Sequence, residues 1–174
     1  MILKRKVITF LIILVCFLLG STVFHVLSFA GIKPNLLIIV TASFGFMRGK
    51  KTGMAVGIVS GLLMDIFWGS TLGFYTLLFA VIGYVNGCFR RLFYDEDIKL
   101  PIALIAASEL LYGLVLYICF YMLYGDFSFG SYLIKLILPE LVYTILATLV
   151  LYQAILHINR RLEAEEQRSA SKFV

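Results

Sequence analysis

The stretch that decides the fold is GMAVGIVSGLLMDIFWGSTLG, residues 53–73, in which every fourth position is a glycine or an aspartate. These positions are Gly53, Gly57, Gly61, Asp65, Gly69 and Gly73. In an otherwise apolar segment, this spacing allows three interpretations: a phosphate-binding loop, an ion or substrate site within a membrane, or a surface where helices pack closely. The rest of the chain has to decide among them.

The composition is that of an integral membrane protein. Hydrophobic residues make up 61% of the 174 residues, charged residues only 14%, and the mean hydropathy is +1.00, far outside the range of soluble domains. We therefore expect one all-α transmembrane domain over residues 1–158, a cytoplasmic tail over residues 159–174, and no separate catalytic domain. Cys16, Cys88 and Cys119 lie far apart in apolar runs, so we interpret them as small buried hydrophobic residues.

Six apolar runs are predicted to cross the bilayer as helices, which takes roughly 20 residues each. They cover residues 7–30, 34–47, 52–68, 72–89, 101–124 and 132–157. Pro34 is expected in the first turn of the second helix, and Pro139 is expected to kink the sixth. A cleaved signal peptide is the alternative for the first run. A re-entrant hairpin is the alternative for the second and third, but it would place three cations near the membrane centre, so two spanning helices are preferred.

The basic residues predict the orientation. With six helices and both termini inside, the inner segments hold Lys4, Arg5, Lys6, Arg48, Lys50, Lys51, Arg90, Arg91, Lys99, Arg160 and Arg161. The outer loops then hold only Lys33. Because cytoplasmic loops are enriched in Lys and Arg, both termini are predicted to lie in the cytoplasm. The clusters at 48–51 and 90–91 are suited to contact anionic lipid or a cytoplasmic partner.

Close helix packing is the best supported interpretation of the spaced glycines. A nucleotide loop needs a glycine-rich turn between a strand and a helix, and a lone aspartate cannot supply the carboxylates of a divalent-metal site. We expect no metal, no cofactor and no nucleic-acid partner. A step of four residues advances about 400° around a helix, so Gly53, Gly57 and Gly61 form a ridge without side chains. Gly83 and Gly87 repeat the spacing, and the pattern leaves open whether the partner is internal or another protein.

Four charged residues lie within the predicted spans, where such groups usually face a bundle interior, a cavity or a partner. They are Asp65, Glu109, Lys135 and Glu140. Asp65 and Lys135 both fall toward the outer face, and we hypothesise an ion pair between them. Glu109 lies roughly 12 Å from the inner end of its helix and Glu140 in the outer half, so these two are not expected to pair. Packing leaves Asp65 unexplained, since a carboxylate near the C-terminus of its own helix opposes the helix dipole.

Several segments together resemble the family of the rod shape-determining protein MreD. They are KPN at 33–35, the whole of 43–87, RRLFYDEDIKLP at 90–101 and LPELVYTILATLVLY at 138–152. The most specific is GLLMDIFWGSTLGFYTL at 61–77, which combines spaced glycines with the aspartate. The family motif falls on Pro34, Gly57, Gly61, Asp65, Gly69 and Gly73.

The resemblance implies a multi-pass bacterial inner-membrane protein of the cell-elongation machinery. It implies a non-enzymatic scaffold that binds the bitopic protein MreC and acts with MreB, the glycan polymerase RodA and its transpeptidase in side-wall peptidoglycan synthesis. It also implies a fold similar to the substrate-binding subunits of energy-coupling-factor vitamin transporters. The competing class is therefore small-molecule transport, with Asn86, Glu109 and Tyr112 as candidate contacts. Short, weakly polar outer loops disfavour transport, whereas an outward-open polar cavity would favour it and a closed apolar interior would favour the scaffold.

Overall fold

The computed structural model describes residues 2–23, 33–69, 72–92, 98–122 and 129–170. Within these ranges the backbone is almost entirely helical and contains no strand, in agreement with the all-α prediction. In chain order the elements are α1 (Ile2–Leu18), η1 (Leu19–Val23), α3 (Leu36–Arg48), α4 (Lys50–Phe67), α5 (Phe74–Cys88), η2 (Phe89–Leu92), α6 (Lys99–Leu116), η3 (Tyr117–Tyr121), α7 (Phe129–Tyr132), η5 (Leu133–Ile137) and α8 (Leu138–Ala170).

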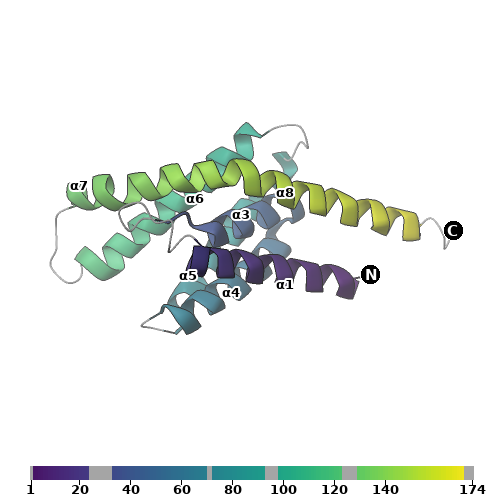
Figure 1. The fold of residues 1–174 in the computed structure, drawn as a ribbon, viewed down its shortest axis with the longest axis horizontal. Helices are drawn as coiled ribbons and strands as arrows, with labels where there is room; N and C mark the ends of the chain where they lie inside the picture. Colours follow the sequence, from purple (N-terminus) through teal and green to yellow (C-terminus); the bar gives the residue numbers. More distant parts are fainter. Residues whose placement is uncertain (1, 24–32, 70–71, 93–97, 123–128, 171–174) are drawn as a thin grey trace.

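The short π and 3-10 segments continue neighbouring α-helices, so the described part of the chain forms six helical rods (Figure 1). The two chain termini lie at the same end of the molecule, hereafter the terminal end, and the opposite end is the distal end. The RGKK segment is not an extended loop. Gly49 alone, with φ 91°, separates α3 from α4, and the two lysines form the first turn of α4.

Among the described residues, three helices are long and apolar enough to cross a membrane. They cover Lys4–Thr22, Lys99–Tyr121 and Phe129–Ala164. The helix α3 is apolar but has only 13 residues, about 20 Å of rise against a hydrocarbon core about 30 Å thick. The chain is thus built as a membrane protein, and the crossing of the bilayer by the shorter helices stays a prediction.

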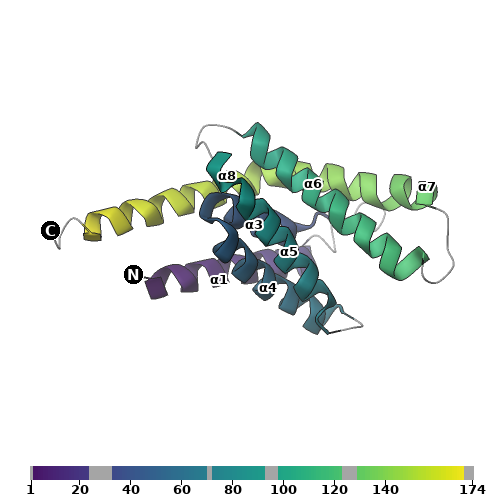
Figure 2. The same cartoon turned by 180° about the vertical axis from the view of Figure 1, so that it is seen from behind.

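The helix α3 forms the centre of the molecule. Every residue from 36 to 47 is buried, and α1, α4, α5, α6 and α8 all pack against it (Figures 1 and 2). A helix that is apolar all round lies either in lipid or inside protein, and here the other helices enclose α3. Asn35 caps its start, because the N–H of Ile38 donates to Asn35 Oδ1 (3.3 Å). Pro34 therefore precedes the cap, and its expected place in the first turn is wrong.

The long helices α6 and α8 pack against each other and against α3, and Figure 2 shows α6 crossing in front of α8. The π-helical segment η5 ends two residues before Pro139. Proline lacks an N–H and its ring clashes with the carbonyl four residues earlier, and a wider π turn relieves that clash. The predicted disturbance around Pro139 is thus a local π segment of the last helix.

The cysteines do not share one environment. Cys16 is buried and Cys119 is partly buried, but Cys88 is exposed, and all three are free thiols. The expectation of burial is therefore wrong for Cys88. The buried face of α5 is the one that carries Gly83 and Gly87, and a residue one step past Gly87 points about 100° away from that face.

Candidate functional site

The glycine ridge, Gly53, Gly57 and Gly61, packs against α5 within the same chain. A Cβ added at any of the three would overlap backbone atoms of α5. The contacting pairs are Gly53 with Gly83, Gly57 with Phe79, and Gly61 with Thr76. Because backbone cannot move aside as a flexible side chain can, only glycine allows this separation of the two helices. The ridge therefore has an internal partner.

The second glycine pair completes a three-helix contact. A Cβ added at Gly83 would overlap the backbone of Gly53, and one added at Gly87 would overlap the backbone of Lys50. On α3, a Cβ added at Gly45 would lie 2.7 Å from the carbonyl oxygen of Gly83. The helices α3, α4 and α5 thus meet backbone to backbone, and the predicted packing role of Gly83 and Gly87 is confirmed.

Asp65 lies at the end of α4 and caps the beginning of α5. Its Oδ2 accepts hydrogen bonds from the N–H of Gly73 (3.0 Å), the N–H of Thr76 (3.0 Å) and the Thr76 hydroxyl. Its Oδ1 accepts from the N–H of Tyr75 (2.9 Å). The side chain is 2% exposed. One carboxylate therefore satisfies three of the four backbone donors that a helix N-terminus leaves without partners.

This geometry answers why a carboxylate stands at residue 65. The positive end of the α5 dipole faces it, which outweighs the unfavourable position at the end of α4. The hypothesised ion pair with Lys135 is wrong, because the hydrogen-bond partners of Asp65 all belong to the turn into α5, and Lys135 is exposed on η5. Gly73, with φ 97°, is the N-cap of α5, and a Cβ added at Gly69 would lie 2.8 Å from Asp65 Cα.

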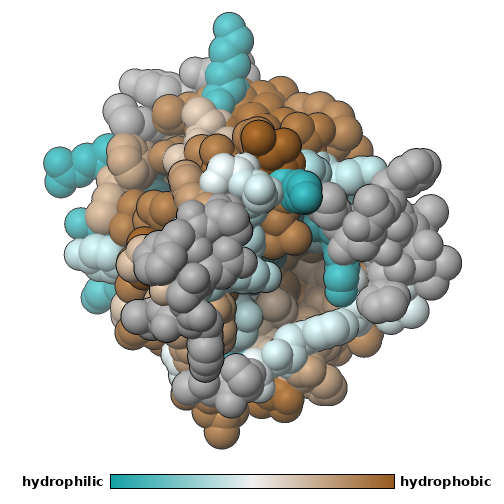
Figure 3. Space-filling view, turned by 90° about the vertical axis from the view of Figure 1, so that its left-hand side faces the viewer, coloured by the Kyte–Doolittle hydropathy of each residue, from teal (hydrophilic) through white to brown (hydrophobic). Residues whose placement is uncertain are grey.

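A cavity of about 370 Å³, the distal pocket, opens at the distal end. Figure 3 views this end and shows its hollow between polar and apolar residues. The pocket is lined by Cys16, Phe17, Gly20, Ser21, Lys33, Pro34, Asn35, Leu36, Leu37, Met64, Trp68, Tyr75, Tyr112, Leu136 and Glu140. Residues from α1, α3, α4, α5, α6 and the last helix contribute, so the pocket lies on the axis of the bundle. Its lining mixes apolar groups with a cation, an acid, an amide and two phenols.

Two charged residues of opposite sign line this pocket. The ammonium group of Lys33 lies 4.3 Å from the centre of the Trp68 ring, a cation–π distance. Glu140 also lines the pocket and is partly buried, at the start of α8. Lys33 is close enough to interact electrostatically with Glu140. The pocket therefore presents separate positive and negative groups to whatever enters it.

The carboxyl groups of Glu109 and Glu140 lie within hydrogen-bonding reach of each other. The expectation that they would not pair is wrong, because α6 and α8 pack against each other and bring the two side chains together. Glu109 is 2% exposed, and neither of its oxygens has a protein donor among the described residues. Buried polar groups need partners, and a proton held between the two carboxyls or a cation from the pocket can supply one.

Of the three candidate transport contacts, only Tyr112 lines the distal pocket. Asn86 instead joins α5 to α6, donating from Nδ2 to the Ser108 hydroxyl (2.7 Å) and to the Ile82 carbonyl (2.9 Å). Glu109 lies behind Glu140. The outer loop at 123–128 is outside the described residues. The structure thus brings Tyr112, Glu109 and Glu140 together and leaves Asn86 in a structural role.

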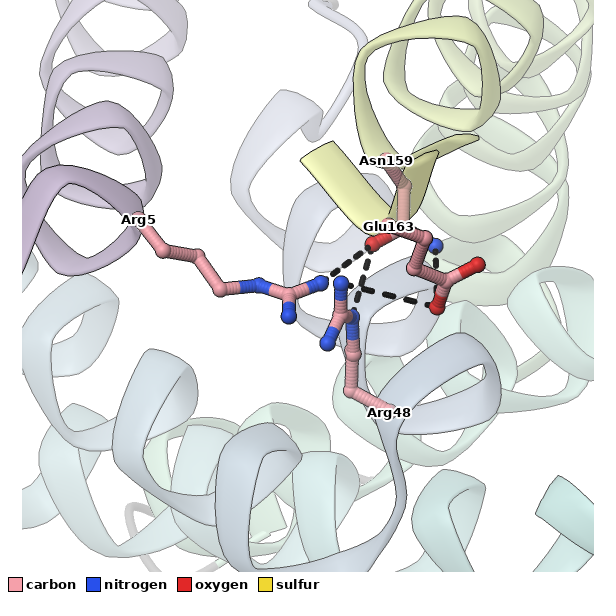
Figure 4. Close-up of polar contacts among 4 residues, drawn as sticks. All are labelled: Arg5, Arg48, Asn159 and Glu163. Atoms are coloured by element: carbon pink, nitrogen blue, oxygen red, sulfur yellow. Dashed lines mark hydrogen bonds and ion pairs between the residues drawn. The ribbon is translucent and has the colours of Figure 1, made fainter. Parts of the chain in front are cut away.

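The terminal-end cluster, Arg5, Arg48, Asn159 and Glu163, holds three helices together (Figure 4). Asn159 Oδ1 accepts from Arg48 Nε (2.7 Å) and from Arg5 (3.2 Å). Arg48 also lies 3.5 Å from a carboxylate oxygen of Glu163. The side chains come from α1, α3 and α8, so the cluster fixes the terminal end of the bundle. Arg48, read from sequence as part of a lipid- or partner-facing basic cluster, serves this internal contact.

Sequence reasoning missed several residues of these sites. Asn159 and Glu163 stand four residues apart, the spacing that puts two polar side chains on one helix face, and that spacing was the available signal. Thr76 follows Gly73 by three residues, as in a helix N-terminus. Lys33 stood out only as the single cation in the predicted outer loops. None of these signals names a partner, because the partners come from other helices.

Comparison with known proteins identifies the family. The family model of the rod shape-determining protein MreD matches residues 3–161. Neither a curated protein nor a solved structure matches the chain. The match takes in the glycine ridge, Asp65, the distal pocket and part of the terminal-end cluster. The chain belongs to the MreD family of rod shape-determining proteins.

Proposed function

We propose that this chain is a non-enzymatic membrane scaffold that binds MreC and helps organise side-wall peptidoglycan synthesis with MreB, RodA and its transpeptidase. The family match supports a role in rod-shape determination, and three long apolar helices support a membrane location. The proposal includes a multi-pass position in the bacterial inner membrane, a transmembrane domain over 1–158, and a cytoplasmic tail over 159–174. The position of both termini at one end of the molecule is compatible with that orientation.

The observation that carries the partner proposal is the acid pair at the distal pocket. The glycine ridge is occupied by α5, so it is not available to a second protein. Glu109, by contrast, has no donor among the residues that the structure describes, and Glu140 beside it lines the pocket. A buried carboxylate without a donor is costly unless a partner supplies one. The distal pocket is therefore the contact site proposed for MreC, which would present a basic or other donor group there.

The test is recovery of MreC with the full-length chain from membranes. Glu140→Gln removes the pocket carboxylate while keeping its shape. Losing one side of a buried charged contact costs roughly 2–5 kcal/mol, so recovery of MreC is expected to fall at least about tenfold. Glu163→Gln in the terminal-end cluster is the matched control and should leave recovery unchanged. Undiminished recovery with folded Glu140→Gln protein would contradict the proposed contact site.

A small-molecule transporter subunit is the alternative function. The specific observation in its favour is the distal pocket, whose volume lies in the range of ligand sites, roughly 300–1,000 Å³. Lys33 and Glu140 would suit a small zwitterion. The proposed likeness to vitamin-binding subunits belongs to this alternative.

Mass spectrometry of the purified chain separates the two functions. A stoichiometric small molecule, released on denaturation and missing from Glu140→Gln protein, would favour the transporter. If the pocket is instead free of small molecules in membranes that contain MreC, the scaffold is favoured.

A further inference from the structure

A groove of about 790 Å³ runs between α1 and α4, with α3 at its floor. Its floor is formed by well-buried residues, including Ile13, Phe44 and Val56. Its walls include Phe10 and Leu11 of α1, which are about half exposed. In a membrane those exposed walls face lipid hydrocarbon, so the groove is open along its side to the bilayer.

The groove is closed at its distal end and charged at its terminal end. Toward the distal end, the rings of Phe17 and Phe67 lie 5.1 Å apart and join α1 to α4. At the terminal end the lining includes four cations, Arg5, Lys6, Arg48 and Lys51. No carboxylate is among the described residues that line the groove. An apolar channel that ends in a group of cations is complementary in shape and charge to an anionic amphiphile.

The four cations do not have equal roles. Arg5 and Arg48 are bound to Asn159 in the terminal-end cluster, and Arg48 is also paired with Glu163. Lys6 of α1 and Lys51 of α4 stand on opposite walls of the mouth, on exposed positions. The cluster holds the α1 wall beside α3 through Asn159, and the two lysines supply the charge that a phosphate can meet.

We infer that this groove binds one anionic phospholipid, with an acyl chain between α1 and α4 and its phosphate between Lys6 and Lys51. Basic pockets between membrane helices near the cytoplasmic face are a known kind of headgroup site. The side opening favours a flexible chain that enters from the bilayer, and the absence of a lining carboxylate favours a phosphate over the basic flank of another helix. The inference uses the proposed cytoplasmic position of the terminal end but does not depend on MreC binding.

The test is native mass spectrometry of the full chain in nonionic detergent, titrated with phosphatidylglycerol or phosphatidylcholine. One phosphatidylglycerol should bind about 30-fold more tightly than phosphatidylcholine, because two surface lysines together contribute about 2 kcal/mol. The double variant Lys6→Gln/Lys51→Gln should bind both lipids equally. Arg90→Gln/Arg91→Gln, which removes as much charge elsewhere at the terminal end, should keep the preference.

A second variant tests the acyl part of the groove with every cation in place. Ala55→Trp fills the channel from an exposed position and should reduce phosphatidylglycerol binding at least tenfold, with an unchanged melting temperature. Equal binding of the two lipids by the unaltered chain would overturn the inference. So would a preference that survives both groove variants, or one that disappears in the Arg90/Arg91 variant instead. Crosslinking of Lys6→Cys to a protein in membranes, together with no lipid preference, would assign the groove to a partner helix.

Discussion

Replacing Asp65 by asparagine is the most direct perturbation of the α4–α5 hairpin. The substitution keeps the size and polarity of the side chain but removes its charge and turns one acceptor oxygen into a donor NH₂. In the folded protein, Oδ2 accepts three hydrogen bonds from the start of α5 and Oδ1 accepts one. If the asparagine oxygen takes the Oδ2 position, its NH₂ faces the N–H of Tyr75, and two donors then oppose each other.

The expected loss of stability follows from these contacts. Losing one hydrogen bond to a charged acceptor costs about 1.5–3 kcal/mol, and removing a charge from a helix N-terminus costs about 0.3–1 kcal/mol. We expect Asp65→Asn to lower the free energy of unfolding by about 3 kcal/mol. Thr76→Val, which removes only the hydroxyl bond, should cost about half as much. Lys135→Gln should cost less than about 0.5 kcal/mol, the usual range for an exposed position.

The measurement is unfolding of the purified full-length chain in mixed micelles as the denaturing detergent is increased, followed by helical circular dichroism. Asp65→Asn should lower the midpoint of unfolding about twice as much as Thr76→Val. The midpoint of Lys135→Gln should stay close to that of the unaltered chain. A loss of stability from Lys135→Gln as large as that from Asp65→Asn would refute the capping role of Asp65, because it would indicate an ion pair between Asp65 and Lys135. Tolerance of Asp65→Asn would refute it as well.

The other predictions concern packing, the terminal-end cluster and orientation. Gly57→Ala should lower the free energy of unfolding by about 3 kcal/mol, because the added Cβ would overlap the α5 backbone. Gly20→Ala should be neutral, because a Cβ there meets nothing within 4 Å. Equal tolerance of the two substitutions would contradict close packing of the glycine ridge against α5. Asn159→Ala should cost about 2 kcal/mol as two arginine contacts are lost, against about 0.5 kcal/mol for the part-exposed Glu163→Gln, and the reverse order in the same micelle assay would contradict the cluster. A cysteine replacing Lys50 should react with an impermeant thiol reagent only from the cytoplasm, and labelling of intact cells from outside would contradict the orientation.

The sequence was sufficient to predict a packing surface where the spacing of residues along one helix determines it. The four-residue spacing of Gly53, Gly57 and Gly61 predicted a ridge for close approach, and the pair Gly83 and Gly87 predicted a second. A helix turns by a nearly fixed angle per residue, so a side-chain-free strip can be located without knowing what covers it. The strip does not specify its partner, and only the structure shows that the two glycine series meet each other.

Sequence was insufficient where the contact depends on how helices are joined or tilted. The partners of Asp65 lie in the turn and first residues of α5, and their N–H groups are invisible in a pattern of side chains. Glu109 and Glu140 meet because of the placement of α6 against the last helix and its π segment, which rise per residue alone does not predict. The sequence does not distinguish Arg48 from the other cations predicted to be cytoplasmic, because its hydrogen bond to Asn159 depends on how α3 and α8 pack.

In the proposed arrangement, α5 covers the glycines of the segment 53–73, and a second protein meets this segment only at its distal end. Site-specific photocrosslinking in native membranes tests it, with the crosslinking residue placed in turn at Met64 and Trp68, which line the distal pocket, and at Met54, which is exposed near the terminal end. We predict crosslinks to MreC from Met64 and Trp68 and none from Met54. Crosslinks to MreC from Met54, with none from the two pocket positions, would contradict it.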